Sequence, residues 1–401
     1  MEKKPNIHIV IYSEIFEYDG GRETWLSYFL PNLYERGIFD NIYVYHIKPR
    51  TNKDNLKTKF KSIVNFNETD IGIPNEHNSF RNAYLYTRNT YYQLNRNIAS
   101  NDIILVIGTR MELLPSILLK IKFKEQIVLV PWIRSITVGE TISQRNYVFG
   151  QIVKILESIC FILADYAICN GTDTFEYYSN TYKRLNGKLA IIENAVNIED
   201  YKFCNEEVCA SKPLKIAYIG RFASAKGFEQ LINAVNIYYD QIQEEKAESI
   251  EFHVWGHGNL ESIIPEYIIN HGVLARKDVP LALRDCDCVV LLNKSTNNEA
   301  AGVSHSLLEA MAAGKIIIAW DNKVHNRIIN NDSAFLIEEG NISELANLFI
   351  KLANEEIPAK ILVSKGIKAR EKVMDFDISN HISKFENLVE KGLKYNPVPD
   401  N

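Results

Sequence analysis

Cysteine is scarce in this chain, with six in 401 residues, and long apolar runs are missing. So few cysteines cannot form the disulfide framework of a small secreted domain, and they fit a reducing, cytosolic location. No apolar stretch reaches the ~18 residues that a membrane-spanning helix needs. The first residues, MEKKPNIHIV, lack the organisation of a secretory signal peptide. We therefore expect a cytoplasmic globular protein.

Two segments come close to the missing features. VFGQIVKILESICFILA (148–164) is strongly apolar, but Lys154 and Glu157 interrupt it, so we predict a buried helix. Cys286 and Cys288 form a lone C-x-C pair before the run VVLL. A structural zinc site needs further ligands, so small core residues are predicted here.

An excess of positive charge is also absent, because the formal net charge is −5. This balance argues against a nucleic-acid-binding protein. The charge is uneven, however: residues 51–150 hold 13 Lys and Arg against 8 Asp and Glu, including the runs KTKFKS and KIKFKE. Most such runs are solvated surfaces. A peripheral contact with an anionic partner such as a membrane is the alternative.

The apolar pattern of the first half is typical of a parallel sheet. A strand at IHIVIYS (7–13) is followed by the glycine turn EYDGGRE, an amphipathic helix ending near Arg36 and a strand at NIYVYHI (41–47). This order predicts a βαβ unit. Further strands are predicted at 102–108, 126–132, 166–170 and 188–194. Residues 50–80 show no clear periodicity, and we expect an irregular, exposed segment there.

The same pattern restarts after a polar linker at 194–213. A strand at LKIAYIG (214–220) precedes a helix at 228–242, and further strands are predicted at 250–256, 288–293, 315–320 and 334–339. We predict two doubly wound α/β domains, 1–200 and 213–378, with a C-terminal helix and tail (379–401) packing back on the first. Ligands of such sheets bind beyond the carboxyl ends of the strands.

Two basic residues fall at such an end, in YIGRFASAKGFEQL (218–231). Arg221 leaves the strand and Lys226 stands just before the next helix. Cations beside a helix N-terminus suit a diphosphate. Two exposed loop residues would give the same pattern.

Glu309 is unexpected in LLEAMAAG, an otherwise apolar helix, because an unpaired carboxylate is costly to bury. Two explanations stay open. Ser306 and Glu309 match the S-x-x-E capping box. If Ser304 begins the helix instead, Glu309 lies in its second turn and needs a partner from outside, such as the cis-diol of a ribose. The tract GVSHS would offer backbone N–H groups to a phosphate.

In this order and spacing, the motifs resemble glycosyltransferase family four, which has the GT-B fold. The resemblance covers nearly the whole chain. GRFxxxKG and LLEAMAAG carry it, with weaker support from GGRETWL (20–26), ADYAICN (164–170), IIENAVNIEDY (191–201), VWGHGNL (254–260) and DVPLALRDCDCVVLLNKS (278–295). It implies two Rossmann-like domains facing each other across a cleft and retaining transfer from a nucleotide-diphosphate sugar, UDP- or GDP-linked, without a bound metal or other cofactor.

The resemblance also implies roles for individual residues. Arg221 and Lys226 would hold the donor diphosphate, and Glu309 the ribose hydroxyls. Other donor contacts would come from three segments: Gly20 and Gly21, Gly272 to Leu274 (with Val273), and Gly302, Val303, Ser304 and His305. A glycan or lipid-linked acceptor in bacterial surface polysaccharide or glycoconjugate synthesis is expected, at the inner face of the plasma membrane.

The sequence departs from the family pattern at two positions. Ala301 stands where the family has a second glutamate, and Glu299 is the nearest acid. The stretch VPWIRSIT (130–137) lacks the histidine that many members carry near the reacting sugar, and Arg134 and Ser135 are candidate replacements. These departures keep a second hypothesis open: a catalytically silent GT-B protein that binds or stabilises an active glycosyltransferase.

The remaining histidines and tyrosines look structural. His8 and His253 lie in strand patterns, so core or rim positions are predicted. YLYTRNTYYQL (84–94) has helical spacing, and packing is a simpler explanation than a sugar-stacking platform.

Overall fold

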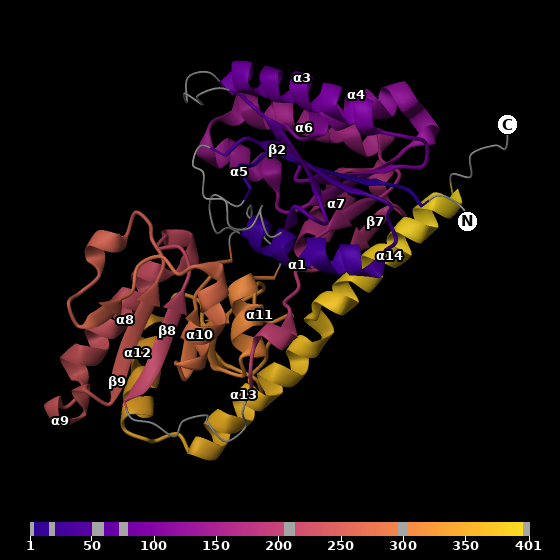
Figure 1. Cartoon of the computed structure of the whole chain (residues 1–401). Helices are drawn as coiled ribbons and strands as arrows, with labels where there is room; N and C mark the ends of the chain where they lie inside the picture. The colour runs from indigo at the N-terminus through magenta and orange to yellow at the C-terminus, as the bar shows by residue number, and fades with distance from the viewer. Residues whose placement is uncertain are drawn as a thin grey trace. The chain divides into compact units, whose positions relative to one another are not determined.

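The structure is a computed structural model that describes residues 4–15, 21–49, 60–71, 79–203, 213–295 and 303–395. These residues form two compact units. Unit 1 holds the described residues up to Asn194 and from Ile378 onward, and unit 2 holds those from Ala195 to Asp377. Each unit has its own parallel sheet with helices packed against it (Figure 1). This confirms the predicted class of two doubly wound α/β domains.

The sheet of unit 1 has the order β3-β2-β1-β4-β5-β6-β7. Its strands are β1 (Ile7–Ile11), β2 (Ile42–Ile47), β3 (Asn65–Thr69), β4 (Ile103–Ile107), β5 (Val128–Ile133), β6 (Ala167–Cys169) and β7 (Leu189–Ile191). The central strands β1 and β4 are buried along their whole length. In a parallel sheet that is covered on both faces, the strands are apolar at nearly every position. These two strands could therefore be predicted from continuous apolar runs in the sequence.

Helices cover both faces of this sheet. One face packs against α3 (Ser79–Asn97), α4 (Leu113–Phe123) and α6 (Tyr147–Leu163), which share an apolar core with β1, β4 and β5. On the other face, the ring of Trp132 lies against Phe29 of α1 (Gly21–Arg36) and Phe385 of α14 (Ile378–Tyr395). The unit is completed by α5 (Thr137–Gln144) and α7 (Thr172–Thr181). The last helix of the chain therefore belongs to the core of unit 1.

Two short edge strands were not predicted. The irregular segment expected over 50–80 contains β3, which pairs with β2 from Asn65 to Thr69. In unit 2, β10 (Ile268–Asn270) pairs with β9. Both strands have several exposed or half-exposed residues, because an edge strand is covered less completely. Backbone pairing forms them without an apolar pattern in the sequence.

The prediction of a buried helix at 148–164 is wrong in part. Val153, Cys160 and Phe161 of α6 are buried, but Val148, Ile155 and other apolar side chains of the same helix are exposed. A helix that covers one face of a sheet buries only the stripe that faces it. The apolar outer side of α6 is thus a surface feature.

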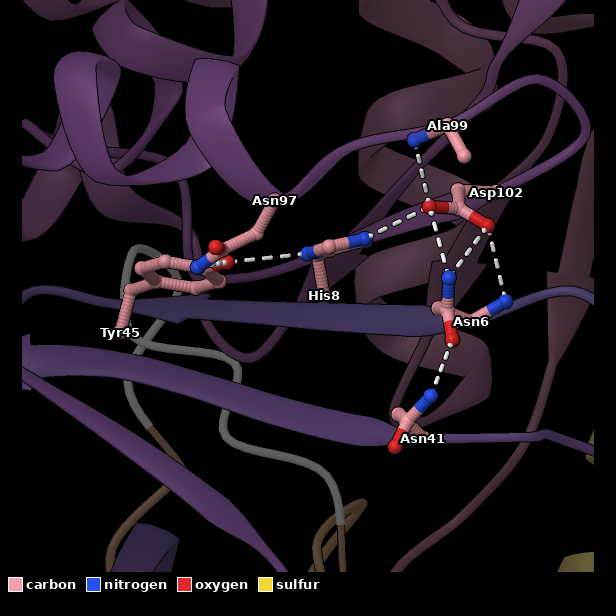
Figure 2. A network of polar contacts seen from close by, with 7 residues as sticks. All are labelled: Asn6, His8, Asn41, Tyr45, Asn97, Ala99 and Asp102. Carbon is pink, nitrogen blue, oxygen red and sulfur yellow. Dashed lines mark hydrogen bonds and ion pairs between the residues drawn. The ribbon is translucent and has the colours of Figure 1, made fainter.

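A buried polar cluster closes the amino-terminal edge of the unit 1 sheet (Figure 2). Asp102 Oδ1 accepts a hydrogen bond of 2.8 Å from the Asn6 backbone N–H, and Asp102 Oδ2 lies 3.0 Å from Nε2 of His8. Burial alone would raise the pKa of Asp102, but the hydrogen bonds from His8, Asn6 and Ala99 outweigh it and hold the pKa below its usual value. His8 is fully buried, as predicted, and joins two strands to the turn before β4.

The sheet of unit 2 has the order β10-β9-β8-β11-β12-β13. Its other strands are β8 (Leu214–Ile219), β9 (Ile250–Trp255), β11 (Cys288–Leu291), β12 (Ile316–Asp321) and β13 (Phe335–Glu338). The helices are α8 (Phe228–Gln241), α9 (Glu244–Ala247), α10 (Val279–Arg284), α11 (His305–Ala312), α12 (Ile342–Ala353) and α13 (Ala359–Val373). Cys286, Cys288 and His253 are buried, as predicted.

Apolar helices long enough to cross a bilayer were not found among the described residues.

Candidate functional site

The loops after β8 and β11 meet at the carboxyl edge of the unit 2 sheet. Gly227, the residue before α8, has a φ of +68°, and a Cβ atom there would lie 2.3 Å from the carbonyl oxygen of Leu292. Only glycine fits this left-handed position and this close approach. The backbone N–H of Lys294 donates to the carbonyl of Ala225 at 3.1 Å, so the two loops are joined.

Three cations gather on these joined loops. Arg221 follows β8 and is exposed, whereas Lys226 is half-buried at the end of the turn Ser224–Lys226. Burial first, and then the charge of Arg221, lower the pKa of Lys226. Lys294, which the sequence did not single out, donates from Nζ to Ser224 Oγ at 3.2 Å. No carboxylate of the described residues forms an ion pair with Arg221, Lys226 or Lys294. The arrangement suits an anion.

A second polar group fixes the loop after β11. Both carboxylate oxygens of Glu339 accept from the backbone N–H of Ser295, at 3.1 and 3.0 Å, and Oε2 also accepts from Asn322 at 2.7 Å. Nearby, burial lowers the pKa of His325 to about 4, and its Nδ1 lies 3.0 Å from the Trp320 carbonyl. His325 is therefore a neutral, structural histidine at neutral pH.

Glu309 has its partner outside its own helix. Ser304 occupies the N-cap of α11 without a side-chain capping bond, so Ser306 lies inside the helix and the capping-box interpretation is wrong. Glu309 falls in the second turn, is only 3% exposed and forms an ion pair with Nη1 of Arg276. The alternative, in which Ser304 begins the helix and Glu309 needs an external partner, is the one the structure shows.

Arg276 follows the segment that the resemblance placed against the nucleotide base. Gly272 has a φ of +69°, and its carbonyl accepts from the Gly256 N–H at 2.8 Å. Val273 is exposed and Leu274 is half-buried. Beside them, the rings of Trp255 and His271 stack at 4.2 Å with an interplanar angle of 7°. No sequence pattern predicts this stack, because Trp255 ends β9 whereas His271 follows β10.

The donor-contact segment at 302–305 is described in part. Val303 is buried, and Ser304 and His305 are half-buried at the start of α11. Gly20, Glu299, Ala301 and Gly302 lie outside the described residues. Ligands of such sheets bind at the carboxyl edge. In unit 2 this edge carries the loop residues Arg221, Lys226 and 272–274, and Glu309 from the second turn of α11.

Arg134 and Ser135 follow β5 at the carboxyl edge of the unit 1 sheet. Arg134 Nη2 donates to Asn194 Oδ1 at 2.7 Å, and the guanidinium lies 5.2 Å from the ring centre of Trp25. Burial first, and then the charge of Arg22, lower the pKa of Arg134 to about 9. Nη1 is buried without a hydrogen-bond partner among the described residues. Gly21 begins α1, which also carries Arg22 and Trp25.

Groups of three or more His, Cys, Asp or Glu side chains placed to hold a metal ion do not occur in the described part of the chain.

Comparison with solved structures defines the class of the fold as GT-B. Sucrose-phosphate synthase from Thermosynechococcus elongatus aligns with a TM-score of 0.75 over 98% of this chain and 100% of its own, at 14% identity. HepE of Anabaena, solved with UDP and glucose, aligns with a TM-score of 0.73 over 96% and 100%, at 15% identity. TarM aligns with a TM-score of 0.71 over 96% and 98%, at 13% identity. Such low identities establish the fold alone.

Sequence comparison relates most of unit 2 to a family of glycosyl transferases. Residues 203–369 match the family model of glycosyl transferases group 1. A curated relative, the poly(ribitol-phosphate) alpha-N-acetylglucosaminyltransferase of Staphylococcus aureus (strain COL), is 23% identical over 180 residues. This match covers 43% of the chain and only 34% of the relative. Residues 203–369, which contain the cationic loops and Glu309, are therefore similar to the group 1 glycosyl transferases, in a chain that has the GT-B fold.

Proposed function

We propose that the protein is a retaining, metal-independent glycosyltransferase that moves a hexosyl group from a nucleotide-diphosphate sugar to a hydroxyl acceptor. The donor is UDP-linked or GDP-linked. UDP is favoured, because HepE of the same fold is described in complex with UDP and with UDP-glucose. The acceptor is a glycan or lipid-linked hydroxyl in bacterial surface polysaccharide or glycoconjugate synthesis. The protein acts in the cytoplasm, at the inner face of the plasma membrane.

The observation that carries the proposal is the combination of cations and a buried carboxylate at one sheet edge. A diphosphate binds to positive charge that is not already neutralised. This charge comes from Arg221, Lys226 and Lys294, which form no ion pair with a carboxylate among the described residues. Glu309 supplies the acceptor oxygens that a ribose diol requires, held by Arg276. The segments at 272–274 and 303–305 complete the donor site, with Gly20, Gly21, Glu299 and Gly302 as further proposed contacts.

The proposed reaction breaks the bond between the anomeric carbon and the diphosphate oxygen. A bond from the anomeric carbon to the acceptor oxygen forms, and the acceptor proton passes to the leaving phosphate. Negative charge increases on the diphosphate as its bond to the sugar breaks, and fixed cations aimed at that charge lower the barrier. Arg134 and Ser135 are the proposed contacts on the acceptor side.

The role of Glu309 is tested by binding of UDP and of its 2′,3′-dideoxy analogue. Hydrogen bonds to a charged group contribute about 1.5–3 kcal/mol, so Glu309→Gln should weaken UDP binding by roughly 10- to 100-fold. The wild type should prefer UDP to the dideoxy analogue, and Glu309→Gln should lose that preference. Arg276→Gln is the matched control: it removes the ion pair but keeps the carboxylate, so it should lower the melting temperature more than the affinity. Equal UDP affinity in all three proteins would overturn the ribose assignment.

Metal independence is tested by assaying transfer in EDTA. We expect unchanged turnover, because Arg221 and Lys226 supply the charge that Mg²⁺ would bring. Loss of turnover in EDTA with recovery on adding Mg²⁺ or Mn²⁺ would contradict it. A silent partner protein, the second hypothesis, would bind the nucleotide with the same ribose preference yet show no turnover with any donor in either buffer.

A further inference from the structure

The outer side of α6 carries an apolar stripe that the core does not use. Val148, Ile152, Ile155, Ile159 and Ile162 follow one another at helical spacing and are 37–65% exposed. Val153, Cys160 and Phe161 on the opposite side of the helix fill the sheet-facing core. Because these five aliphatic side chains lie on successive turns of one side of the helix, they form a contiguous patch rather than scattered surface residues.

The neighbouring helices extend this patch. Leu118 and Ile121 of α4 are exposed, and so are Phe80, Tyr84 and Tyr92 of α3. The rings of Phe80 and Phe149 lie 5.6 Å apart and join α3 to α6, while Lys122 donates from Nζ to Asn95 at 2.6 Å and joins α4 to α3. We call the exposed outer side of these three helices the three-helix face. Its helices lie side by side over one face of the unit 1 sheet (Figure 1).

The charge of the three-helix face has one sign. Its exposed charged residues are all basic: Arg81, Arg88 and Arg96 on α3, Lys122 on α4 and Lys154 on α6. The only acidic residue on the three helices, Glu157, is fully buried on the inner side. Lys120, which belongs to the basic run KIKFKE, is buried and paired with Asp165 at 2.8 Å, so it adds nothing to the surface charge.

We infer that the three-helix face docks on a lipid bilayer that contains anionic lipids. Aliphatic and aromatic side chains flanked by Lys and Arg are the composition of a surface that inserts at the boundary between headgroups and acyl chains. An anionic leaflet attracts each basic side chain near it. The inference deepens the proposed membrane-peripheral role, on which it rests, by naming the surface that makes the contact.

The charge and the apolar residues of the three-helix face favour an anionic bilayer over two other partners, a second copy of the chain and a polyanionic glycan. In a two-fold dimer the same patch meets itself, and a face with only positive charge would then repel its copy. A polyanionic glycan would match the arginines, but it offers no apolar phase for the five aliphatic residues of α6. The combination of both features fits an anionic bilayer.

The test is flotation of the full chain with vesicles of phosphatidylcholine, alone or with about a third phosphatidylglycerol. We expect binding to the anionic vesicles that weakens as salt is raised. The double variant Arg81→Gln/Arg88→Gln should bind them roughly 25-fold more weakly, at about fivefold per basic residue. Ile155→Gln/Ile159→Gln should weaken binding by roughly tenfold or more. The matched control is Ile263→Gln/Ile361→Gln, which changes two exposed isoleucines of unit 2 and should bind as the wild type does.

Three results would overturn the inference: no binding of the wild type to anionic vesicles, equal binding of all variants, or a wild-type dimer in sedimentation that the isoleucine variant of α6 dissociates. The stabilisation of each protein by UDP is measured in parallel. If vesicle binding fails while UDP still stabilises the protein, the docking surface is wrong and the donor site stands. If UDP does not stabilise the protein while vesicles still bind it, the donor site is wrong and the docking surface stands.

Discussion

Lys226 and Glu309 carry opposite charges at the same edge of the unit 2 sheet, where Glu309 is buried and Lys226 is half-buried. Glu309 is compensated by Arg276, whereas Lys226 has no paired carboxylate among the described residues, and burial and Arg221 lower its pKa. A bound anion would favour the charged form of Lys226. The protein without donor therefore keeps one of the two charges unneutralised.

Replacing these cations should affect the rate more than the binding. Arg221→Ala and Lys226→Ala should each lower kcat by roughly 10²-fold or more, the effect of removing one donor that faces charge developing in the transition state. UDP affinity should fall less. Because both act on one diphosphate, the double variant should lose less than the product of the two single losses. Steady-state kinetics with the sugar donor measures this, and multiplicative losses would place the two residues on separate groups.

The sequence predicted part of this site. It indicated that Glu309 needs an external partner if α11 begins at Ser304, but Arg276, 33 residues earlier, could not be named as that partner. Lys294 and the stack of Trp255 on His271 were missed for the same reason. The spacing of residues in the sequence predicts individual helices and strands. These contacts join residues from separate elements, so they form only after the strands have paired.

At the scale of elements, α6 joins the loops after β4 and β5 through one carboxylate. Glu157 Oε1 accepts from Thr109 at 2.6 Å and from Tyr178 at 2.7 Å, and Oε2 accepts from Tyr182 at 2.6 Å. The hydroxyl oxygens of Thr109 and Thr137, at the start of α5, lie 2.6 Å apart, and Thr109 accepts in this contact. The cluster lies close to Ser135, whose carbonyl oxygen is 3.3 Å from the hydroxyl oxygen of Tyr178. It therefore fixes the loop that presents Arg134 and Ser135.

This cluster should make the stability of unit 1 pH-dependent. Burial raises the pKa of Glu157 to about 7, and the three hydroxyl donors offset only part of the rise. Between about pH 4.5, the ordinary pKa, and about pH 7, Glu157 is protonated in the folded state but ionised in the unfolded state. The stability that Glu157 contributes is therefore full below about pH 4.5 and is lost as the pH rises through about 7. Glu157→Gln should remove that dependence and raise the melting temperature at pH 8, by the equivalent of about 1–3 kcal/mol. Thermal unfolding from pH 5 to 8 measures it, and parallel curves for both proteins would contradict it.

The predicted strands agree with the structure within three residues at their ends, because central parallel strands carry an apolar pattern of their own. The edge strands β3 and β10 were missed, since backbone pairing alone forms them. The outer side of α6 was misjudged because an apolar surface for docking and an apolar core have the same composition. Periodicity could not separate the two.

At the scale of the whole molecule, two separate cores should give two unfolding transitions. Phe385→Ala empties a buried site beside Phe29 and Trp132 and should cost about 3–5 kcal/mol. The unit 1 transition should fall by roughly 10 °C. Phe349→Ala, the matched cavity beside Phe252 in unit 2, should lower the other transition. UDP should raise mainly the transition that Phe349→Ala lowers. Calorimetry measures all three, and one transition moved equally by both variants would show that the cores unfold together.

The place of α14 in unit 1 has a consequence for biosynthesis. Trp25 and Trp132 are covered by His381 and Phe385, which a ribosome reaches only after it has translated all of unit 2. At 5–20 residues per second, these ~200 residues take roughly 10–40 s. For that time the nascent first half presents uncovered aromatic surface, the kind of surface that makes folding intermediates prone to aggregate. The half of the protein that is made first is thus the half that finishes folding last.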